Sequence, residues 1–238
     1  MTTLNISGTI DDVLAPCDIT KTGFGTVNLY GSNTFDGAVI VSNGTLRIFH
    51  SNALGGTNGS TIVNGLAGCT LGLSGNLNLE EPLVLNGERN NAGTLRIDSG
   101  SNTLSGPVTV LSQVRLVVYT GALVVKCGVS VGAGDPGGSL VINSGTSTYF
   151  YDNPLLIGQK TFYTDSSGLT VLGVSGNAWG DTLVANGTLR CDVPDALPPT
   201  ASLRLGIDYA PGGTLNLNGN NQTRSEEHTS ELQSRITI

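Results

Sequence analysis

The sequence predicts an all-β fold and, among such folds, a solenoid of short parallel strands. Glycine accounts for 34 of the 238 residues, and charged residues make up 12%. These shares are about twice and about half the usual ones. Short stretches alternate apolar and polar residues, and one strand-turn unit recurs along the chain. Such units bury their apolar faces only by stacking on their neighbours.

The clearest unit runs from Gly25 to Ile48. Apolar residues alternate with polar or small ones at Val27–Leu29, Val39–Val41 and Leu46–Ile48, which is the period of strands with one buried face. Between the last two strands, Ser42–Gly44 supplies residues that tolerate positive φ or close a turn through their own side chains. The unit therefore reads strand, turn, strand, turn, strand.

The unit returns in weaker form at Gly93–Val118 and at Gly168–Cys191. The second copy repeats the Ser-Asn-Thr turn and the valine pair, and the third places Trp179 where the first has Phe35. Because the copies begin far apart, we expect each repeat period to span several coils.

Two other all-β folds compete with the solenoid. Asn-Gly between alternating hydrophobic residues indicates hairpins, and dense turn signals also suit a sandwich or a barrel. The dipeptide occurs at Asn43-Gly44, Asn64-Gly65, Asn86-Gly87 and Asn186-Gly187. The solenoid is favoured because the turns recur with the repeat and the strands are very short.

The first copy and the residues after it resemble the autotransporter-associated β-strand repeat, also called the passenger-associated transport repeat. The matching positions are Gly25, Thr26, Gly31, Asn33, Thr34, Phe35, Gly37, Val39, Val41, Gly44, Thr45, Leu46, Ala53, Leu54 and Gly55. The resemblance implies a right-handed parallel β-helix, usually one segment of a longer secreted or surface-displayed protein. The other copies match it in part.

The β-helix is expected to occupy residues 1–223. At roughly 20 to 25 residues per coil, about ten coils fit into this length. Residues 224–238 are interpreted as a non-native tail, because Arg224–Arg235 resembles a translated sequencing adapter and lacks the apolar alternation. The first residues show no signal peptide, which favours an internal fragment.

Two regions depart from the repeat. Gly121–Tyr163 contains a glycine-rich loop and a group of aromatic residues, and an inserted loop or widened coil is expected there. The segment Asp192–Leu205 carries the main proline cluster and is interpreted as an excursion before Thr214–Leu217 resumes the strand pattern.

The charge pattern argues against nucleic acid as a partner. The formal net charge is −7, and the 11 basic residues form no cluster. No stretch approaches 18 uninterrupted apolar residues, so no membrane span is expected within the segment.

The four cysteines carry no zinc or redox spacing. Cys69, Cys127 and Cys191 lie in apolar, strand-like runs, which favours buried small side chains, with disulfides as the alternative. No metal site or cofactor is predicted.

No catalytic centre is predicted either. His50 ends a repeat strand beside Ser51 and is interpreted as a loop or rim histidine rather than a base. The carboxylate pairs Asp11-Asp12 and Glu80-Glu81 are interpreted as turns or solvated edges, since adjacent strand residues point to opposite faces. The basic residues Lys21, Lys126 and Lys160 are scattered.

The aromatic residues leave one alternative open. Those from Tyr149 to Tyr163, together with Trp179, suit the packing of an irregular coil or a platform on which a sugar stacks.

The sequence therefore predicts a non-catalytic structural or adhesive β-helix segment of a secreted or surface-displayed, autotransporter-like bacterial protein associated with the outer membrane. A carbohydrate-active or carbohydrate-binding extracellular β-helix is the alternative. The expected partners of the segment, in either role, are a host surface, the extracellular matrix or a polysaccharide, besides the remainder of the same chain.

Overall fold

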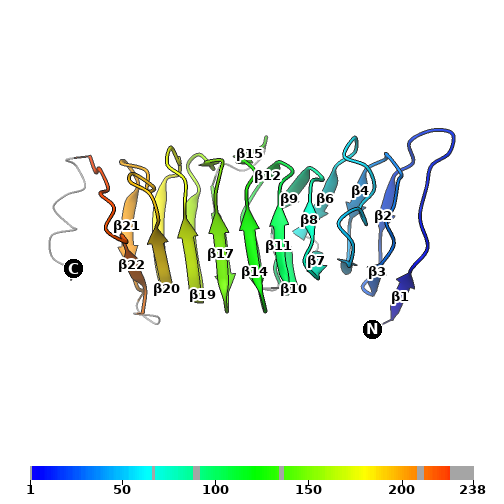
Figure 1. The fold of residues 1–238 in the computed structure, drawn as a ribbon, viewed down its shortest axis with the longest axis horizontal. Helices are drawn as coiled ribbons and strands as arrows, with labels where there is room; N and C mark the ends of the chain where they lie inside the picture. The colour runs from blue at the N-terminus through cyan, green and yellow to red at the C-terminus, as the bar shows by residue number, and fades with distance from the viewer. Residues whose placement is uncertain (1, 66–67, 88–91, 134–136, 208–211, 226–238) are drawn as a thin grey trace.

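The computed structural model describes residues 2–65, 68–87, 92–133, 137–207 and 212–225, and these residues contain strands but no α-helix. Figure 1 shows an elongated stack in which the strands lie across the long axis, with β1 at one end and β22 near the other. Two sheets of fifteen and seven strands build the described stack.

The first face of the stack belongs to the larger sheet. It consists of β1 (Thr3–Ile6), β3 (Thr26–Leu29), β5 (Thr45–Ile48), β7 (Thr70–Ser74), β10 (Leu95–Ser99), β13 (Val114–Val118), β16 (Ser139–Ser144), the first halves of β19 (Thr161–Leu172) and β20 (Asp181–Cys191), and β21 (Ser202–Leu205).

The second face belongs to the same sheet and joins the first through the long strands β19 and β20. It consists of β8 (Asn78–Leu79), β11 (Ser101–Leu104), β14 (Ala122–Val125), β17 (Ser147–Phe150), the second halves of β19 and β20, and β22 (Thr214–Asn216).

The third face is the smaller sheet. It consists of β2 (Ile19–Lys21), β4 (Val39–Val41), β6 (Thr61–Asn64), β9 (Leu83–Asn86), β12 (Val108–Val110), β15 (Val129–Val131) and β18 (Leu155–Leu156).

Strand pairing decides between the solenoid and its competitors. The paired strands of the described residues run parallel, as in β3–β5 and β10–β13. Parallel neighbours need a crossover connection, whereas hairpins and antiparallel sandwiches do not. The expected right-handed parallel β-helix is confirmed. The Asn-Gly turns do not close hairpins: Gly44, with φ of 69°, forms a corner between two faces.

The number of coils is close to the expected one. The stack has about nine turns, where the sequence suggested about ten. Coil length varies along the first face: Val27 pairs with Leu46, 19 residues later, and Leu116 pairs with Ile142, 26 residues later. At about 4.8 Å per turn, nine turns make a rod about 43 Å long.

The core runs the length of the rod because equivalent apolar residues of successive coils stack. On the first face, Leu46, Leu71, Leu95 and Leu116 pair in register and are buried. Each coil buries its apolar face on the next, so stability comes from neighbouring coils rather than from one centre.

The structure agrees with the expectation for the first irregular region and differs from that for the second. The longest step described on the first face, from Leu116 to Ile142, overlaps the region Gly121–Tyr163, where a widened coil was expected. The proline segment is not an excursion. Ala196, Leu197 and Ala201 are buried, and β21 pairs with β20, so this segment completes a coil. Its prolines occupy the connections, where no ladder hydrogen bond is lost.

The three sequence copies do not occupy equivalent faces. In the first copy, β3 and β5 both lie on the first face. In the third copy, the matching strands are the second halves of β19 and β20, which lie on the second face. The repeated motif therefore specifies a strand-turn-strand step and not a fixed face. Residues 226–238 lie outside the described residues, so the interpretation of residues 224–238 as a non-native tail stays a prediction.

Candidate functional site

The paired aspartates are bound into a turn between coils. Asp12 Oδ2 accepts hydrogen bonds from the backbone N–H groups of Cys17 at 3.1 Å and Asp36 at 2.9 Å. Asp11 Oδ1 accepts one from Thr34 Oγ1 at 3.1 Å. Both carboxylates thus have the turn role that the sequence suggested.

The second carboxylate pair lies in a turn between β8 and β9, as the sequence suggested, but Glu81 is not a solvated edge. Its side chain is buried, with 4% of the residue exposed, and its one hydrogen bond among the described residues comes from Thr61 Oγ1 at 3.4 Å to Oε1. The Oε2 atom is buried without a partner there. Burial raises the pKa of Glu81 from 4.5 to about 7. Glu80 is exposed whereas Glu81 is buried, so the two adjacent carboxylates do point to opposite sides; what the sequence did not indicate is that the bend holds Glu81 inside the stack.

The histidine and its neighbouring serine serve the local turn. His50 Nδ1 accepts the N–H of Asn52 at 3.1 Å, and Ser51 Oγ accepts the N–H of Asn78 in the following coil at 3.0 Å. His50 is half-buried. These contacts fit the rim histidine that the sequence suggested.

The three lysines are indeed far apart, but two of them are buried. Lys21 Nζ donates to the carbonyl oxygens of Thr22, Gly23 and Asn43 at 2.9, 2.7 and 2.9 Å. Lys160 is fully buried and donates to the Gly137 carbonyl at 2.6 Å. Both cations therefore satisfy carbonyl groups inside the stack, as a buried charge must.

The cysteines are unpaired thiols in the described structure. Cys69, Cys127 and Cys191 are buried as predicted, and Cys17 is exposed. Burial raises the pKa of Cys127 to about 11 and that of Cys191 to about 12, so both stay protonated at neutral pH.

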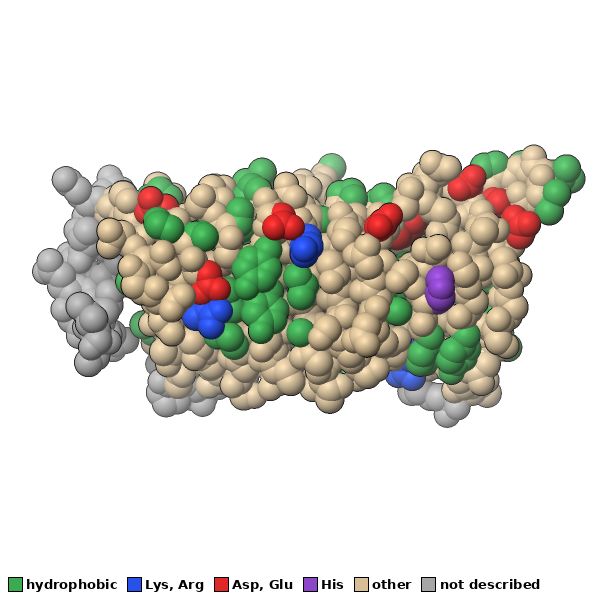
Figure 2. All heavy atoms as spheres, viewed as in Figure 1, with side chains coloured by type: hydrophobic (Ala, Val, Ile, Leu, Met, Phe, Trp, Pro, Cys, Tyr) green, Lys and Arg blue, Asp and Glu red, His purple; other side chains and the backbone are tan. Residues whose placement is uncertain are grey.

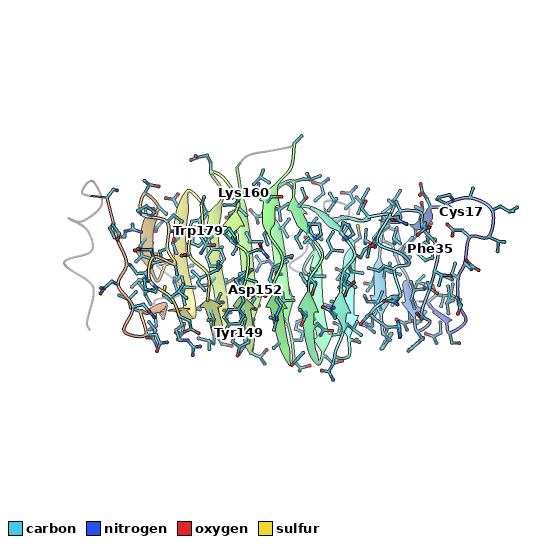
Figure 3. All side chains as sticks on the ribbon, turned by 45° about the horizontal axis from the view of Figure 1, so that its top comes forward. Cys17, Phe35, Tyr149, Asp152, Lys160 and Trp179 are labelled. Carbon is cyan, nitrogen blue, oxygen red and sulfur yellow. The ribbon has the colours of Figure 1, made fainter. Side chains whose placement is uncertain are left out.

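The aromatic residues divide between the core and the surface. Phe150, Phe162 and Trp179 are buried; the Phe162 and Trp179 rings stack at 4.8 Å, and Phe150 meets Phe162 edge-on at 5.9 Å. Figure 3 shows Trp179 within the stack. The packing interpretation is thus correct for these three residues.

Tyr149 and Tyr151 instead lie on the outer side of the second face, and we call these two residues the tyrosine platform. Their ring centroids are 5.8 Å apart with an interplanar angle of 18°. They flank Phe150, which points inward, because alternate strand residues face opposite sides. Both tyrosines remain partly exposed.

A glycine makes room for the platform. In the coil after β17, a Cβ atom on Gly173 would lie 2.0 Å from Cδ1 and 2.1 Å from Cε1 of Tyr151. The Tyr151 ring therefore lies over the bare backbone of the neighbouring coil. Burial, followed by the Asp192 carboxylate, raises the pKa of Tyr151, so its hydroxyl stays protonated.

Two ion pairs flank the platform. On one side Arg190 binds Asp192 through both ends of its guanidinium, with Nε–Oδ1 at 2.6 Å and Nη2–Oδ2 at 2.8 Å. On the other side Lys126 Nζ lies 3.8 Å from Asp152 Oδ2. Figure 2 shows this arrangement as green side chains between two red-and-blue pairs. Figure 3 labels Tyr149 and Asp152, which belong to the same coil.

Other surface aromatic contacts lie near the ends of first-face strands. Tyr30 stacks on Phe49 at 4.2 Å, and Arg96 lies 5.7 Å from the ring centroid of Tyr119. Arg47 and Arg96 share Asp98, each with one contact of 2.6 Å. This arginine cluster links alternate coils across Gly72, where a Cβ would lie 2.9 Å from Asp98 Oδ2.

Within the described residues, no group of three or more His, Cys, Asp and Glu side chains is placed to hold a metal ion. In the same part of the chain, no helix is long and apolar enough to cross a membrane.

Sequence reasoning grouped the aromatic residues without dividing them. The alternation Tyr149-Phe150-Tyr151 carried the signal for an outward pair around an inward ring. No sequence signal indicated the roles of Gly173 and Arg190, because these residues meet the tyrosines only through the stacking of later coils on β17.

The stacked coils define the class of protein: a parallel β-helix. Two of its segments also identify the repeat, because residues 19–48 and 89–113 match the family model described as passenger-associated-transport-repeat. The first segment covers β2 to β5, and the second contains β10 to β12. These two matches support the resemblance to the passenger repeat that the first copy showed. No curated protein and no solved structure matches the chain significantly.

Proposed function

We propose that this passenger-type β-helix is a non-catalytic, adhesive rod of a secreted or surface-displayed bacterial protein associated with the outer membrane. The observation that carries the proposal is the uninterrupted stack of about nine coils around one continuous core. A solenoid gains length by adding coils that contact only their neighbours. Such a rod holds a binding surface away from the cell.

The engagement of the polar side chains supports a structural role. His50, Ser51 and Asp12 bind backbone groups of turns and neighbouring coils, and Lys21 binds three carbonyl groups. A catalytic base needs a free position beside the group that it activates. These residues instead hold the coils in register.

A carbohydrate-binding role is the second candidate, and the tyrosine platform favours it. Two aromatic rings lie at the surface there, flanked by the ion pairs Arg190–Asp192 and Lys126–Asp152. The four charged side chains form two separate ion pairs, an arrangement that supports binding of a polar ligand.

Adhesion tests the proposed function directly. The full chain would be fused to a heterologous bacterial surface anchor, and the cells would be counted on immobilised host cells, extracellular matrix and polysaccharides. We expect retention above that of cells carrying the anchor alone. Equal retention on every surface would contradict an adhesive role, and release of reducing ends from the polysaccharides would contradict the absence of catalysis.

A further inference from the structure

The tyrosine platform has the chemistry of a ligand-binding surface. Tyr149 lies on β17, and Tyr151 directly follows this strand with its N–H bonded to the Val125 carbonyl at 2.8 Å. The two rings are nearly parallel, and Gly173 leaves room for that of Tyr151. Sites placed on strands are better ordered than sites on loops.

We infer that the tyrosine platform, with Arg190 and Asp192 at its edge, binds a neutral pyranose saccharide. This inference rests on the proposed adhesive function and names the ligand class for it. The C–H face of a pyranose ring is apolar and packs against an aromatic ring, while its hydroxyl groups need hydrogen-bonding partners. The platform and its edge supply both.

Polar groups for the sugar hydroxyls surround the rings. Arg190 offers donors and Asp192 offers acceptors in one planar, bidentate pair. Asn218 donates to Asp192 Oδ1 at 3.1 Å, which steadies the carboxylate. The Tyr151 hydroxyl adds a donor. The aromatic ring contacts the face of the sugar, and the fixed polar groups bind the hydroxyl groups at its edge, so together they orient the sugar.

The charge balance favours a neutral saccharide over an acidic one. Lys126 and Arg190 carry two positive charges, and each is paired with an aspartate, Asp152 or Asp192. The patch is therefore formally neutral, whereas the whole chain has a net charge of −7. An acidic polysaccharide would meet no excess of positive charge there.

The geometry also fixes the direction of the bound chain. Tyr149 and Tyr151 are alternate residues of one coil, so a line through their rings runs along the strands and across the long axis of the rod. The ring spacing of 5.8 Å is similar to the length of one pyranose unit. Two successive sugar units could thus each contact one ring.

Binding of defined oligosaccharides tests the inference. The full chain would be titrated by calorimetry with cello-, xylo-, manno- and laminari-oligosaccharides, with oligogalacturonate as the acidic comparison. We expect one of the neutral series to bind. Y149A and Y151A should each raise Kd about tenfold or more. Y151F keeps the ring but loses the hydroxyl donor, so it should raise Kd less than Y151A does.

Two further variants separate the platform from general effects of surface aromatic residues. Y30A removes an exposed ring that stacks on Phe49 outside the platform, and it should leave Kd unchanged. G173A keeps both tyrosines but places a Cβ where the Tyr151 ring lies, so it should weaken binding while thermal unfolding confirms that the variant is folded.

The outcomes distinguish this inference from the proposed function. Loss of binding in Y149A with retention in Y30A supports the platform. Cell adhesion that persists in Y149A, without any neutral oligosaccharide bound, overturns the inference and leaves the adhesive rod intact. Preference for oligogalacturonate, or dimerisation that requires Tyr149, also overturns it. Absence of adhesion to every surface contradicts the proposed function itself.

Discussion

At the scale of single residues, buried asparagines fasten neighbouring coils together. Asn33, Asn102 and Asn177 occupy the same position in the three sequence copies, and each Oδ1 accepts a backbone N–H from the preceding coil: Ile10 at 2.8 Å, Leu77 at 3.2 Å and Leu155 at 2.8 Å. Nδ2 of Asn33 and of Asn177 also donates to the following coil, to Ala53 O and Ala196 O. The repeated asparagine therefore marks a polar connection through the core.

Removal of one such amide should be costly. N177A leaves the Leu155 N–H and the carbonyls of Val174 and Ala196 without their partner inside the stack. A buried, unsatisfied polar group costs about 1–3 kcal/mol. We expect N177A to lower the free energy of unfolding in urea by about 2–4 kcal/mol, since several groups lose their partner.

The control for N177A is N153A. Asn153 is exposed and donates one hydrogen bond to the Lys126 carbonyl at 2.8 Å. Its loss should change the free energy of unfolding by less than about 1 kcal/mol, because water replaces the contact. Equal effects of the two variants would show that the buried asparagine does not fasten the coils.

Glu81 makes stability depend on pH near neutrality. Its pKa is about 7 in the folded chain against an ordinary value of 4.5. Between these values the folded state holds more protons than the unfolded state, so the free energy of unfolding falls as pH rises. Glu81 stabilises the fold fully below pH 4.5, and this contribution is lost as pH rises through about 7.

E81Q tests this dependence. The amide keeps an acceptor for Thr61 but cannot ionise, so the variant should gain stability relative to the native chain as pH rises from 5 to 8. We expect a relative gain of about 1–3 kcal/mol, measured by urea unfolding at both pH values. A difference that does not change with pH would contradict the buried, ionisable state of Glu81.

At the scale of elements, the corners between strands demand glycine for two separate reasons. Gly44 joins β4 to β5 with φ of 69°, and a Cβ there would lie 2.5 Å from the carbonyl oxygens of Gly23 and Gly25. Gly187 repeats this arrangement in the third copy, with φ of 70° and a Cβ position 2.3 Å from Ser166 O. The Asn-Gly signal thus reflects the close approach of coils as well as the turn.

The pair G44A and G23A separates the two reasons. Gly23 also has positive φ, at 74°, but open space surrounds its Cβ position. G23A should cost about 1 kcal/mol through backbone strain alone. G44A adds the steric clash and should cost about 3 kcal/mol or more. Thermal unfolding of both variants measures the difference, and equal losses would contradict the role of coil contact.

At the scale of the whole molecule, the rod is a series of coils that can be shortened in register. Thr26 and Thr45 are paired partners on the first face, so deletion of residues 26–44 removes one coil and keeps the phase of the stack. We expect the shortened chain to retain its β circular dichroism, and its long dimension by X-ray scattering should fall by about 5 Å.

A deletion out of register is the matched control. Removal of residues 26–37 leaves part of a coil, so the strands after the deletion would no longer stack on the equivalent strands of the coil before it. A one-residue slip already moves the inward side chains of a strand outward. This variant should aggregate or lose cooperative unfolding. If it unfolds like the in-register deletion, stacking of equivalent positions does not specify the fold.

Several features of this fold follow from the sequence alone. The period-two alternation at Val39–Val41 and Leu46–Ile48 determined short strands with one buried face, and the recurring glycine corners determined that the strands turn often. These signals are local, since each depends on residues only a few positions apart. They were enough to predict a solenoid and the burial of three cysteines, whereas the passenger repeat was indicated by the resemblance of the first copy to that family.

Only the tertiary structure decided which residues meet between coils. Coil length varies, so the sequence does not say which residue lies above another. The burial of Glu81, the bond from Asn177 to Ala196 and the place of Tyr151 over Gly173 all depend on that register. The sequence determined the strands and corners because their causes are local. The stacking of coils decided the tyrosine platform and its charged edge because it joins residues far apart in the chain.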